Sequence, residues 1–126
     1  MNARQKENHN FQKVAGHLAS YGFNCLRLSD DWNGADFLAC HNNGVDVLRV
    51  QLKGRFTLDR TKYEGKAIHI AFLQEGRCYL FPHDEMQRKV LKAGKFQGTK
   101  SWDEGGAYST NSKAAWLMDL LVDYEW

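Results

Sequence analysis

Three polar residues, Asp36, Gln51 and Lys53, have the types and the spacing of a site that could bind a metal ion. They belong to two apolar-rich segments on either side of residues 41–44, and the Asn-Gly pair between such runs is a strong signal for a hairpin. A two-residue turn there would put Asp36 directly opposite Gln51, with Cβ atoms about 5 Å apart. Lys53 would share that face because side chains alternate along a strand.

A carboxylate, an amide oxygen and an ammonium held in this way could ligate a hard divalent cation and help to orient an attacking water. Phosphodiester hydrolysis needs these parts. The other face of the second strand carries Leu48, Val50 and Leu52, as expected for the side that meets a core. A plainer interpretation stays open, in which Gln51 and Lys53 form a solvated strand face and Asp36 is a polar residue beside a turn.

The run Gly34-Ala35-Asp36, the hairpin and then Val50-Gln51-Leu52-Lys53 resemble the PD-(D/E)XK nuclease superfamily. The resemblance is to the variant in which Gln replaces the acidic residue before x-Lys, as in Mrr-type restriction endonucleases. The order of elements over roughly residues 5–92 is also similar to that of archaeal Holliday junction resolvases. Two residues depart from the pattern, since Ala35 replaces Pro and Gln51 removes a negative charge.

This resemblance implies a restriction-endonuclease-like α/β (α+β) fold with a mixed central sheet flanked by helices. It implies that Asp36 and Gln51 bind Mg²⁺ or Mn²⁺, and that Lys53 positions water and offsets phosphate charge. Glu7 matches an acidic residue often found on the first helix of the superfamily, although it could simply favour the start of a helix through the helix dipole. The implied function is metal-dependent hydrolysis of nucleic acid, and we expect DNA as the substrate.

Basic residues are concentrated in two stretches although the net charge is only +2. Residues 49–66 carry six basic and two acidic side chains, and residues 86–100 carry five basic and no acidic ones. Such clustering favours a polyanionic partner, whereas two short basic stretches can also be ordinary solvated surface. We expect Arg55, Arg60 and Lys62 to contact phosphates, and Lys92 and Lys95 to matter less.

The elements around the hairpin follow from periodicity and turn residues. We expect a helix over 4–20, a strand over 23–28, a turn over 29–34, a loop over 54–66, strands over 67–73 and 77–81, a helix from Pro82 to about Lys92, a glycine-rich loop over 95–108 and a last helix starting near 109–112. Trp116, Leu117, Leu120, Leu121 and Tyr124 should share one side of that last helix. Trp32 and Trp102 fall in polar loops, where they could stack bases or cover the core.

The length of 126 residues, with 43% hydrophobic and 25% charged, predicts a single domain over residues 1–126. No apolar run reaches the roughly 18 to 20 residues that span a bilayer, and residues 1–10 are too polar for a secretory signal. We therefore expect a cytoplasmic protein without a membrane partner. The three cysteines are far apart, odd in number and set in apolar stretches, which predicts buried thiols.

A second class of function remains open, namely a non-catalytic nucleic-acid-binding or protein-binding module on the same fold. The neutral Gln51 favours this alternative, whereas the retained Asp36 and Lys53 favour catalysis. An enzyme of this size with one site would need a homodimer to cut both strands of a duplex.

Overall fold

The computed structural model describes residues 1–94 and 100–126, in which the strands form a five-stranded and a two-stranded sheet. The main sheet has the order β1 (Phe23–Trp32), β2 (Ala35–His41), β3 (Val47–Leu52), β5 (Ile68–Gln74) and β6 (Arg77–Pro82). Only the β3–β5 pair among these is parallel, so the sheet is mixed. The predicted α+β class with a mixed central sheet is confirmed.

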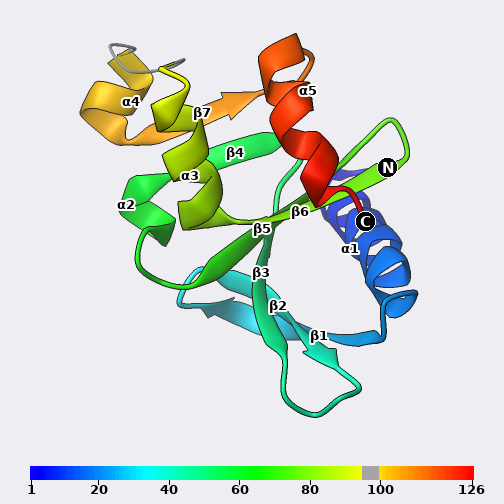
Figure 1. Cartoon of the computed structure of the whole chain (residues 1–126). Coiled ribbons are helices and arrows are strands. Elements are labelled where there is room, and N and C mark those ends of the chain that lie inside the picture. Colours follow the sequence, from blue (N-terminus) through cyan, green and yellow to red (C-terminus); the bar gives the residue numbers. More distant parts are fainter. Residues whose placement is uncertain (95–99) are drawn as a thin grey trace.

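Helix α1 (Ala3–Ala19) covers one face of this sheet (Figure 1). It begins with a capping box, in which Asn2 accepts the backbone N–H of Gln5 and the Gln5 side chain accepts that of Asn2. Phe11, Val14 and Leu18 recur at helical spacing and are buried. The helix predicted over residues 4–20 is confirmed.

The central hairpin has the predicted register but a wider turn. Phe37 pairs with Val50 and Cys40 with Val47, which is the alignment that a two-residue turn would also give. The hairpin closes instead where the His41 N–H donates to the Asp46 carbonyl, at 2.8 Å. The hairpin therefore closes at His41 and Asp46, whereas a two-residue turn would close it at Asn42 and Val45. Each closing residue is one position further from the turn, so the pairing of the remaining residues is unchanged.

Strand β1 is longer than predicted, because residues 29–32 continue it instead of forming a turn. Its pairing with β2 is regular from Phe23 to Arg27, becomes irregular, and resumes where Trp32 faces Ala35. The tight turn between the strands therefore contains only Asn33 and Gly34, both with positive φ. Four residues of β1, 28–31, lie opposite Asp36 alone in β2, an irregularity that strand patterning does not reveal.

Two segments predicted as loops contain regular structure. Residues 54–66 include β4 (Phe56–Asp59) and α2 (Arg60–Tyr63), and residues 100–110 form α4 (Lys100–Gly105) and β7 (Ala107–Thr110). Strands β4 and β7 pair as the second sheet. Elements of four to six residues are too short to produce a clear hydrophobic period, which is why the sequence did not reveal them. Lys95 lies outside the described residues.

The C-terminal half supplies the second cover of the main sheet. Helix α3 (His83–Lys92) starts after Pro82 as predicted, with Asp84 and Glu85 in its first turn. Helix α5 (Ala115–Leu121) and the short helix η1 (Val122–Tyr124) begin later than predicted. Ser112 has a φ of 61°, which is incompatible with a helix at that point. Leu117 and Leu121 are buried, and the rest of the predicted apolar side packs against the same core.

Two apolar clusters occupy the two faces of the sheet. The first joins α1 to Phe37, Val50, Ala71 and Leu80. The second lies on the opposite face, where β5 and β6 meet β4, α3 and α5, and it includes Trp102, which is therefore buried and not in a polar loop. The cysteines are free, but only Cys78 is buried, while Cys25 and Cys40 are partly exposed. None of the helices in the described ranges has the length and apolar character needed to cross a membrane.

Candidate active site

Asp36 and Gln51 lie on β2 and β3, the two strands of the central hairpin. Phe37 and Val50 are paired and both belong to the cluster under α1, so the Gln51 side chain points to the other face of β3. The pairing of β2 with β3 ends at Phe37 and Val50, and on β2 the alternation ends there too, because Ala35 belongs to the cluster on the opposite face of the sheet. Lys53 follows at the end of β3, where its N–H donates to the Ala71 carbonyl at 2.9 Å. The apolar face of β3 is as expected, because Val50 belongs to the cluster under α1 and Leu48 and Leu52 pack against it.

The Asp36 carboxylate is tied to the backbone of β3. Its Oδ2 accepts the Leu52 N–H at 2.9 Å, in a half-buried setting. Burial raises the pKa of Asp36 above its ordinary value, and the nearby carboxylates of Glu7 and Asp31 raise it further. The Leu52 bond and the Lys53 ammonium act in the opposite direction but do not cancel the rise. A carboxylate whose charge is disfavoured in this way would be stabilised by a bound cation.

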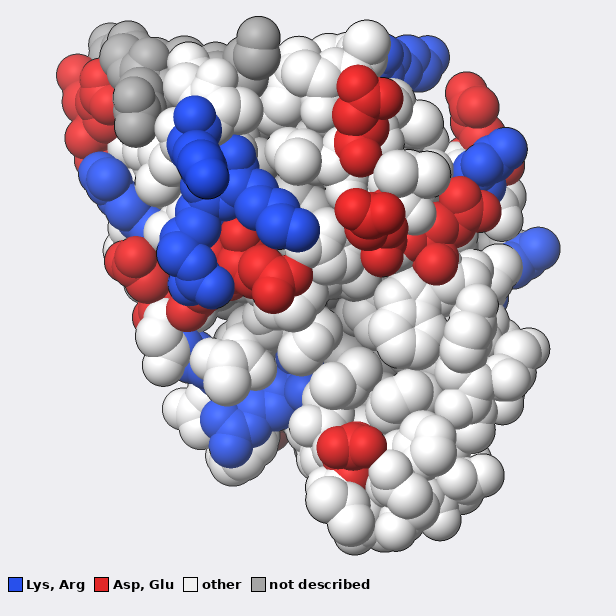
Figure 2. Space-filling view, in the orientation of Figure 1, with Lys and Arg blue, Asp and Glu red and all other residues white. Residues whose placement is uncertain are grey.

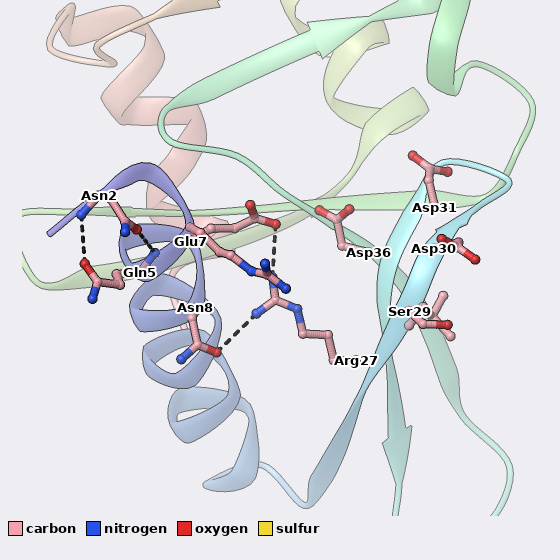
Figure 3. A pocket seen from close by; sticks show the side chains of 11 residues that line it. Asn2, Gln5, Glu7, Asn8, Arg27, Ser29, Asp30, Asp31 and Asp36 are labelled. Atoms are coloured by element: carbon pink, nitrogen blue, oxygen red, sulfur yellow. Dashed lines mark hydrogen bonds and ion pairs between the residues drawn. The ribbon is translucent and has the colours of Figure 1, made fainter.

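Glu7 reaches the same region from α1. With Asp36 and Asp31 it lines a cavity of about 820 Å³, into which the Glu7 and Asp36 carboxylates both point (Figure 3). The Glu7 carboxylate also accepts a hydrogen bond from the Arg27 guanidinium at 3.0 Å. Arg27 therefore holds Glu7 at the edge of the cavity, beside Asp36.

Gln51 contributes an amide oxygen that lacks a protein partner. Its Oε1 is buried, and within the described residues no hydrogen-bond donor reaches it. A buried acceptor left in this state costs free energy, and a cation or a water is the kind of group that would satisfy it. An orphaned amide oxygen is the kind of ligand that a hard divalent cation prefers. In residues 1–94 and 100–126 no three His, Cys, Asp or Glu side chains are grouped to hold a metal ion.

Lys53 is positioned by an aromatic ring. Its Nζ lies 5.2 Å from the centroid of the Tyr63 ring. It also lines a smaller cavity of about 210 Å³ together with Glu7 and Leu52. Lys53 therefore lines this cavity opposite residues of α1.

The three residues expected to contact phosphates lie outside the hairpin, Arg55 just before β4 and Arg60 and Lys62 on α2. Arg55 Nε donates to Ser109 Oγ at 2.7 Å, and the Arg60 guanidinium lies 4.9 Å from the centroid of the Trp102 ring. Lys62 is exposed on α2. Figure 2 shows Lys and Arg side chains gathered over α2 and α3, with Asp and Glu side chains directly beside them. The positive charge of this surface is therefore partly compensated.

Sequence reasoning missed three features of the site. The sequence predicts a turn at Asp31, whereas in the structure this residue lines the cavity with Asp36. Its Oδ1 accepts the Gly34 N–H at 2.8 Å. Tyr63 gave no signal, because the segment around it has little periodicity. Trp32 is half-exposed and stacks with Arg49, whose guanidinium lies 5.1 Å from its ring centroid.

Comparisons with known proteins concern the fold. No protein-family model matches the sequence, and no curated protein matches it either. The bacterial homing endonuclease I-Ssp6803I superposes with a TM-score of 0.49 and 20% identity, over 67% of this chain and 67% of its own. The Holliday junction resolvase Hjc of the archaeal hyperthermophile Archaeoglobus fulgidus superposes with a TM-score of 0.49 and 17% identity, over 63% of this chain and 74% of its own.

At these identities the likeness says nothing about which residues act, so the chemistry rests on the residues of this chain. The fold consists of an N-terminal helix and a mixed five-stranded sheet with a central hairpin. Asp36 lies on one strand of that hairpin and Gln51 on the next. The chain has an α+β fold with a mixed five-stranded sheet flanked by helices, the class that its sequence predicts.

Proposed function

We propose that this protein is a metal-dependent nuclease that hydrolyses phosphodiester bonds of nucleic acid, with DNA as its substrate. The observation that supports the proposal is the central hairpin, in which the Asp36 carboxylate on β2 accepts the Leu52 N–H of β3, next in sequence to Gln51 with its orphaned Oε1. Lys53 lies at the end of the same strand. These are an anionic oxygen, a neutral oxygen and a cation, as the chemistry requires.

Asp36 and Gln51 are the residues that would hold Mg²⁺ or Mn²⁺. Such a cation, when bound, polarises the phosphate and lowers the pKa of a coordinated water. The Lys53 ammonium offsets the negative charge that develops on the phosphate oxygens and helps to orient the attacking water. Glu7, fixed by Arg27, supports the cation from the other side of the cavity.

Arg55, just before β4, and Arg60 and Lys62 of α2 would bind the substrate backbone. Lys62 is exposed and available for a phosphate, whereas Arg55 and Arg60 would have to exchange their present contacts for one. A homodimer would supply the second site needed to cut both strands of a duplex.

A second candidate is a nucleic-acid-binding module without catalysis. The neutral Gln51 and the lack, in the described part of the chain, of a group of three His, Cys, Asp or Glu side chains for a metal favour this alternative. Both candidates predict binding, and only the first predicts cleavage that depends on a cation.

The test is a cleavage assay on plasmid, linear, branched and RNA substrates with Mg²⁺, Mn²⁺ or EDTA. We expect cleavage with either metal, none in EDTA, and none for Lys53→Ala. That variant should fold normally because a lysine facing a cavity contributes little to a core. Lys92→Ala, an exposed lysine on α3, is the matched control and should cleave as the unaltered protein does. Binding without cleavage on every substrate would favour the second candidate.

A further inference from the structure

The ring of Tyr63 connects the α2 turn to the candidate active site. It is only 4% exposed. The Lys53 ammonium lies over the ring. The ring also packs against the β1–β2 turn, because a Cβ added to Gly34 would lie 3.2 Å from it. Gly34 precedes Asp36 by two residues. The same ring therefore touches the chain that carries the carboxylate and the side chain that carries the ammonium.

This ring can attract an ammonium without exchanging a proton. Burial raises the pKa of Tyr63 to about 12, so its hydroxyl stays protonated at neutral pH. An uncharged aromatic ring offers its negative face to a cation placed over it. Lysine has a long, flexible stem, so a fixed attraction at its end limits the positions that the ammonium samples.

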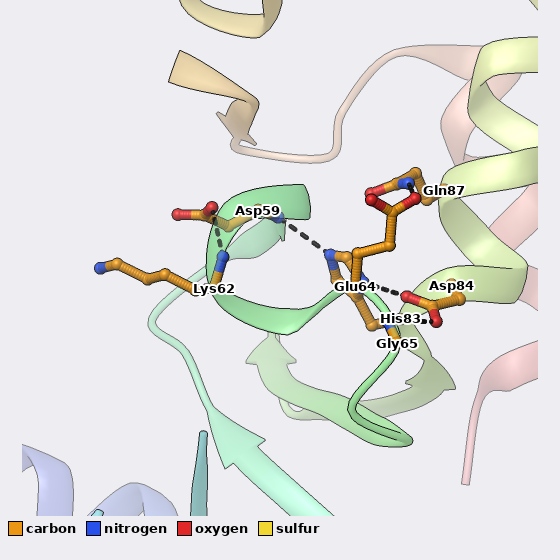
Figure 4. Close-up of polar contacts among 7 residues, drawn as sticks. All are labelled: Asp59, Lys62, Glu64, Gly65, His83, Asp84 and Gln87. Atoms are coloured by element: carbon orange, nitrogen blue, oxygen red, sulfur yellow. Dashed lines mark hydrogen bonds and ion pairs between the residues drawn. The ribbon is translucent and has the colours of Figure 1, made fainter. Parts of the chain in front are cut away.

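The α2 turn that carries Tyr63 is short and is held from outside. Asp59 caps it by accepting the Lys62 N–H, and the Asp59 N–H donates to Nε2 of His83 at 2.9 Å (Figure 4). His83 is fully buried at the start of α3. Because Nε2 accepts this bond, Nδ1 carries the proton and donates to Asp84 at 2.9 Å.

The end of the turn is held by the same helix. Asp84 Oδ2 accepts the Gly65 N–H at 2.9 Å, and the Gln87 side chain donates to Glu64 Oε1 at 3.1 Å. The Tyr63 ring also meets the His83 ring edge to face, with centroids 5.5 Å apart. Helix α3 thus fixes both ends of the turn and the ring between them.

We propose that Tyr63 is a positioning residue for the reaction: its ring, fixed by His83 and Asp84, holds the Lys53 ammonium beside Asp36. The inference rests on the proposed nuclease function, but the contact itself is independent of it. A pre-positioned cation stabilises developing charge better than one that must first be ordered.

The first measurement is the NMR signal of the Lys53 Cε protons, identified by its loss in Lys53→Ala. Protons above an aromatic ring are shifted upfield, so this signal should be upfield of the other lysines in the unaltered protein and in Tyr63→Phe. It should return to the ordinary range in Tyr63→Leu. In Asp84→Asn the ring is retained but its anchor is weakened, so the shift should decrease without a change at residue 63.

The second measurement is the cleavage rate at saturating substrate and metal. Tyr63→Phe should cleave like the unaltered protein, and Tyr63→Leu should lose about tenfold or more in kcat. Tyr79→Leu is the matched control, since it removes a buried tyrosine ring from the same apolar cluster without touching Lys53. It should lower thermal stability as Tyr63→Leu does and leave the Lys53 signal and kcat unchanged below the unfolding transition.

The outcomes separate this inference from the proposed function. A Lys53 signal in the ordinary range in the unaltered protein would overturn the contact, and with it the inference, even if Tyr63→Leu failed to fold. An upfield signal together with no cleavage on any substrate would overturn the nuclease function. Full or increased kcat in a folded Tyr63→Leu would overturn the positioning role while leaving the nuclease intact.

Discussion

The Leu52 N–H donates to the Asp36 carboxylate across the central hairpin, at 2.9 Å. This bond fixes the carboxylate against the strand that also carries Gln51, and it uses one of the two Asp36 oxygens. Leu52 itself points into the core under α1. The Leu52 side chain thus anchors the end of β3 in this core, while the Leu52 backbone N–H positions the Asp36 carboxylate.

Asp36→Asn keeps an oxygen that can accept the Leu52 N–H and removes only the charge. We expect the fold to be retained, Mn²⁺ binding to weaken and kcat to fall by about a hundredfold or more. Calorimetric titration with Mn²⁺ and the plasmid assay measure the two effects. Asp119→Asn, an exposed aspartate on α5, is the control and should change neither. Equal Mn²⁺ affinity in both variants would contradict the assignment of Asp36 as a ligand.

The raised pKa of Asp36 predicts a specific pH dependence of stability. The folded protein retains the Asp36 proton at a pH where the unfolded chain, with a pKa of about 3.9, has lost it. The contribution of this carboxyl is therefore full below that pH and is lost as the pH rises through the folded value. In EDTA, Asp36→Asn should gain stability relative to the unaltered protein between about pH 4 and neutrality.

Denaturant unfolding at several pH values measures this difference. Saturating Mn²⁺ should reverse its sign at neutral pH, because a ligand that binds only the folded state stabilises it. A difference in unfolding free energy that is constant from pH 3.5 upward would show that Asp36 has an ordinary carboxyl pKa.

Gln51 should limit stability in the absence of a cation. Gln51→Met fills the same space without the orphaned oxygen, so we expect about 1 kcal/mol more stability and no cleavage. Gln51→Glu should unfold at a lower temperature in EDTA and bind Mn²⁺ more tightly, since it adds a carboxylate at the site. Thermal unfolding with and without Mn²⁺ checks both. Gln12→Met, on the exposed side of α1, is the control. If Gln51→Met were less stable and Gln51→Glu bound Mn²⁺ no better, Gln51 would not face a cation site.

Nucleic-acid binding should depend on salt through β4 and α2. Neutralising Arg55, Arg60 and Lys62 together should reduce the slope of log affinity against log salt by roughly two to three, if each contacts a phosphate of duplex DNA. Fluorescence anisotropy at several salt concentrations measures the slope. Arg88 and Lys92, both exposed on α3, are the comparison pair and should have a smaller effect.

Lys62→Ala alone should account for about one unit of slope. Arg60→Ala should also lower the unfolding temperature, since the Arg60 side chain stacks on Trp102 and packs against Gly106. An equal effect of both sets on the slope would locate the binding path elsewhere on the surface.

The alternation of polar and apolar residues in β2 and β3 was sufficient to predict how the two strands of the central hairpin align. Shifting this register by one residue would expose Val50 and bury Gln51 and Arg49, so the pattern alone selects the observed pairing. The turn is wider than predicted, but the pairing of β2 with β3 is the predicted one. The reason is that the apolar face, not the turn, determines how the strands align.

The tertiary structure decided what surrounds these residues. Residues 54–66 have no period that predicts a strand or a helix, and only pairing with β7 and bonds to His83 give them β4 and α2. Tyr63 meets Lys53 for that reason alone. Tertiary packing likewise places Glu7 and Asp31 in one cavity with Asp36 and buries the Gln51 Oε1. Strand periodicity is local, so the apolar face of β3 follows from the sequence, whereas the contacts around Asp36 and Gln51 join segments distant in the chain and depend on how those segments pack.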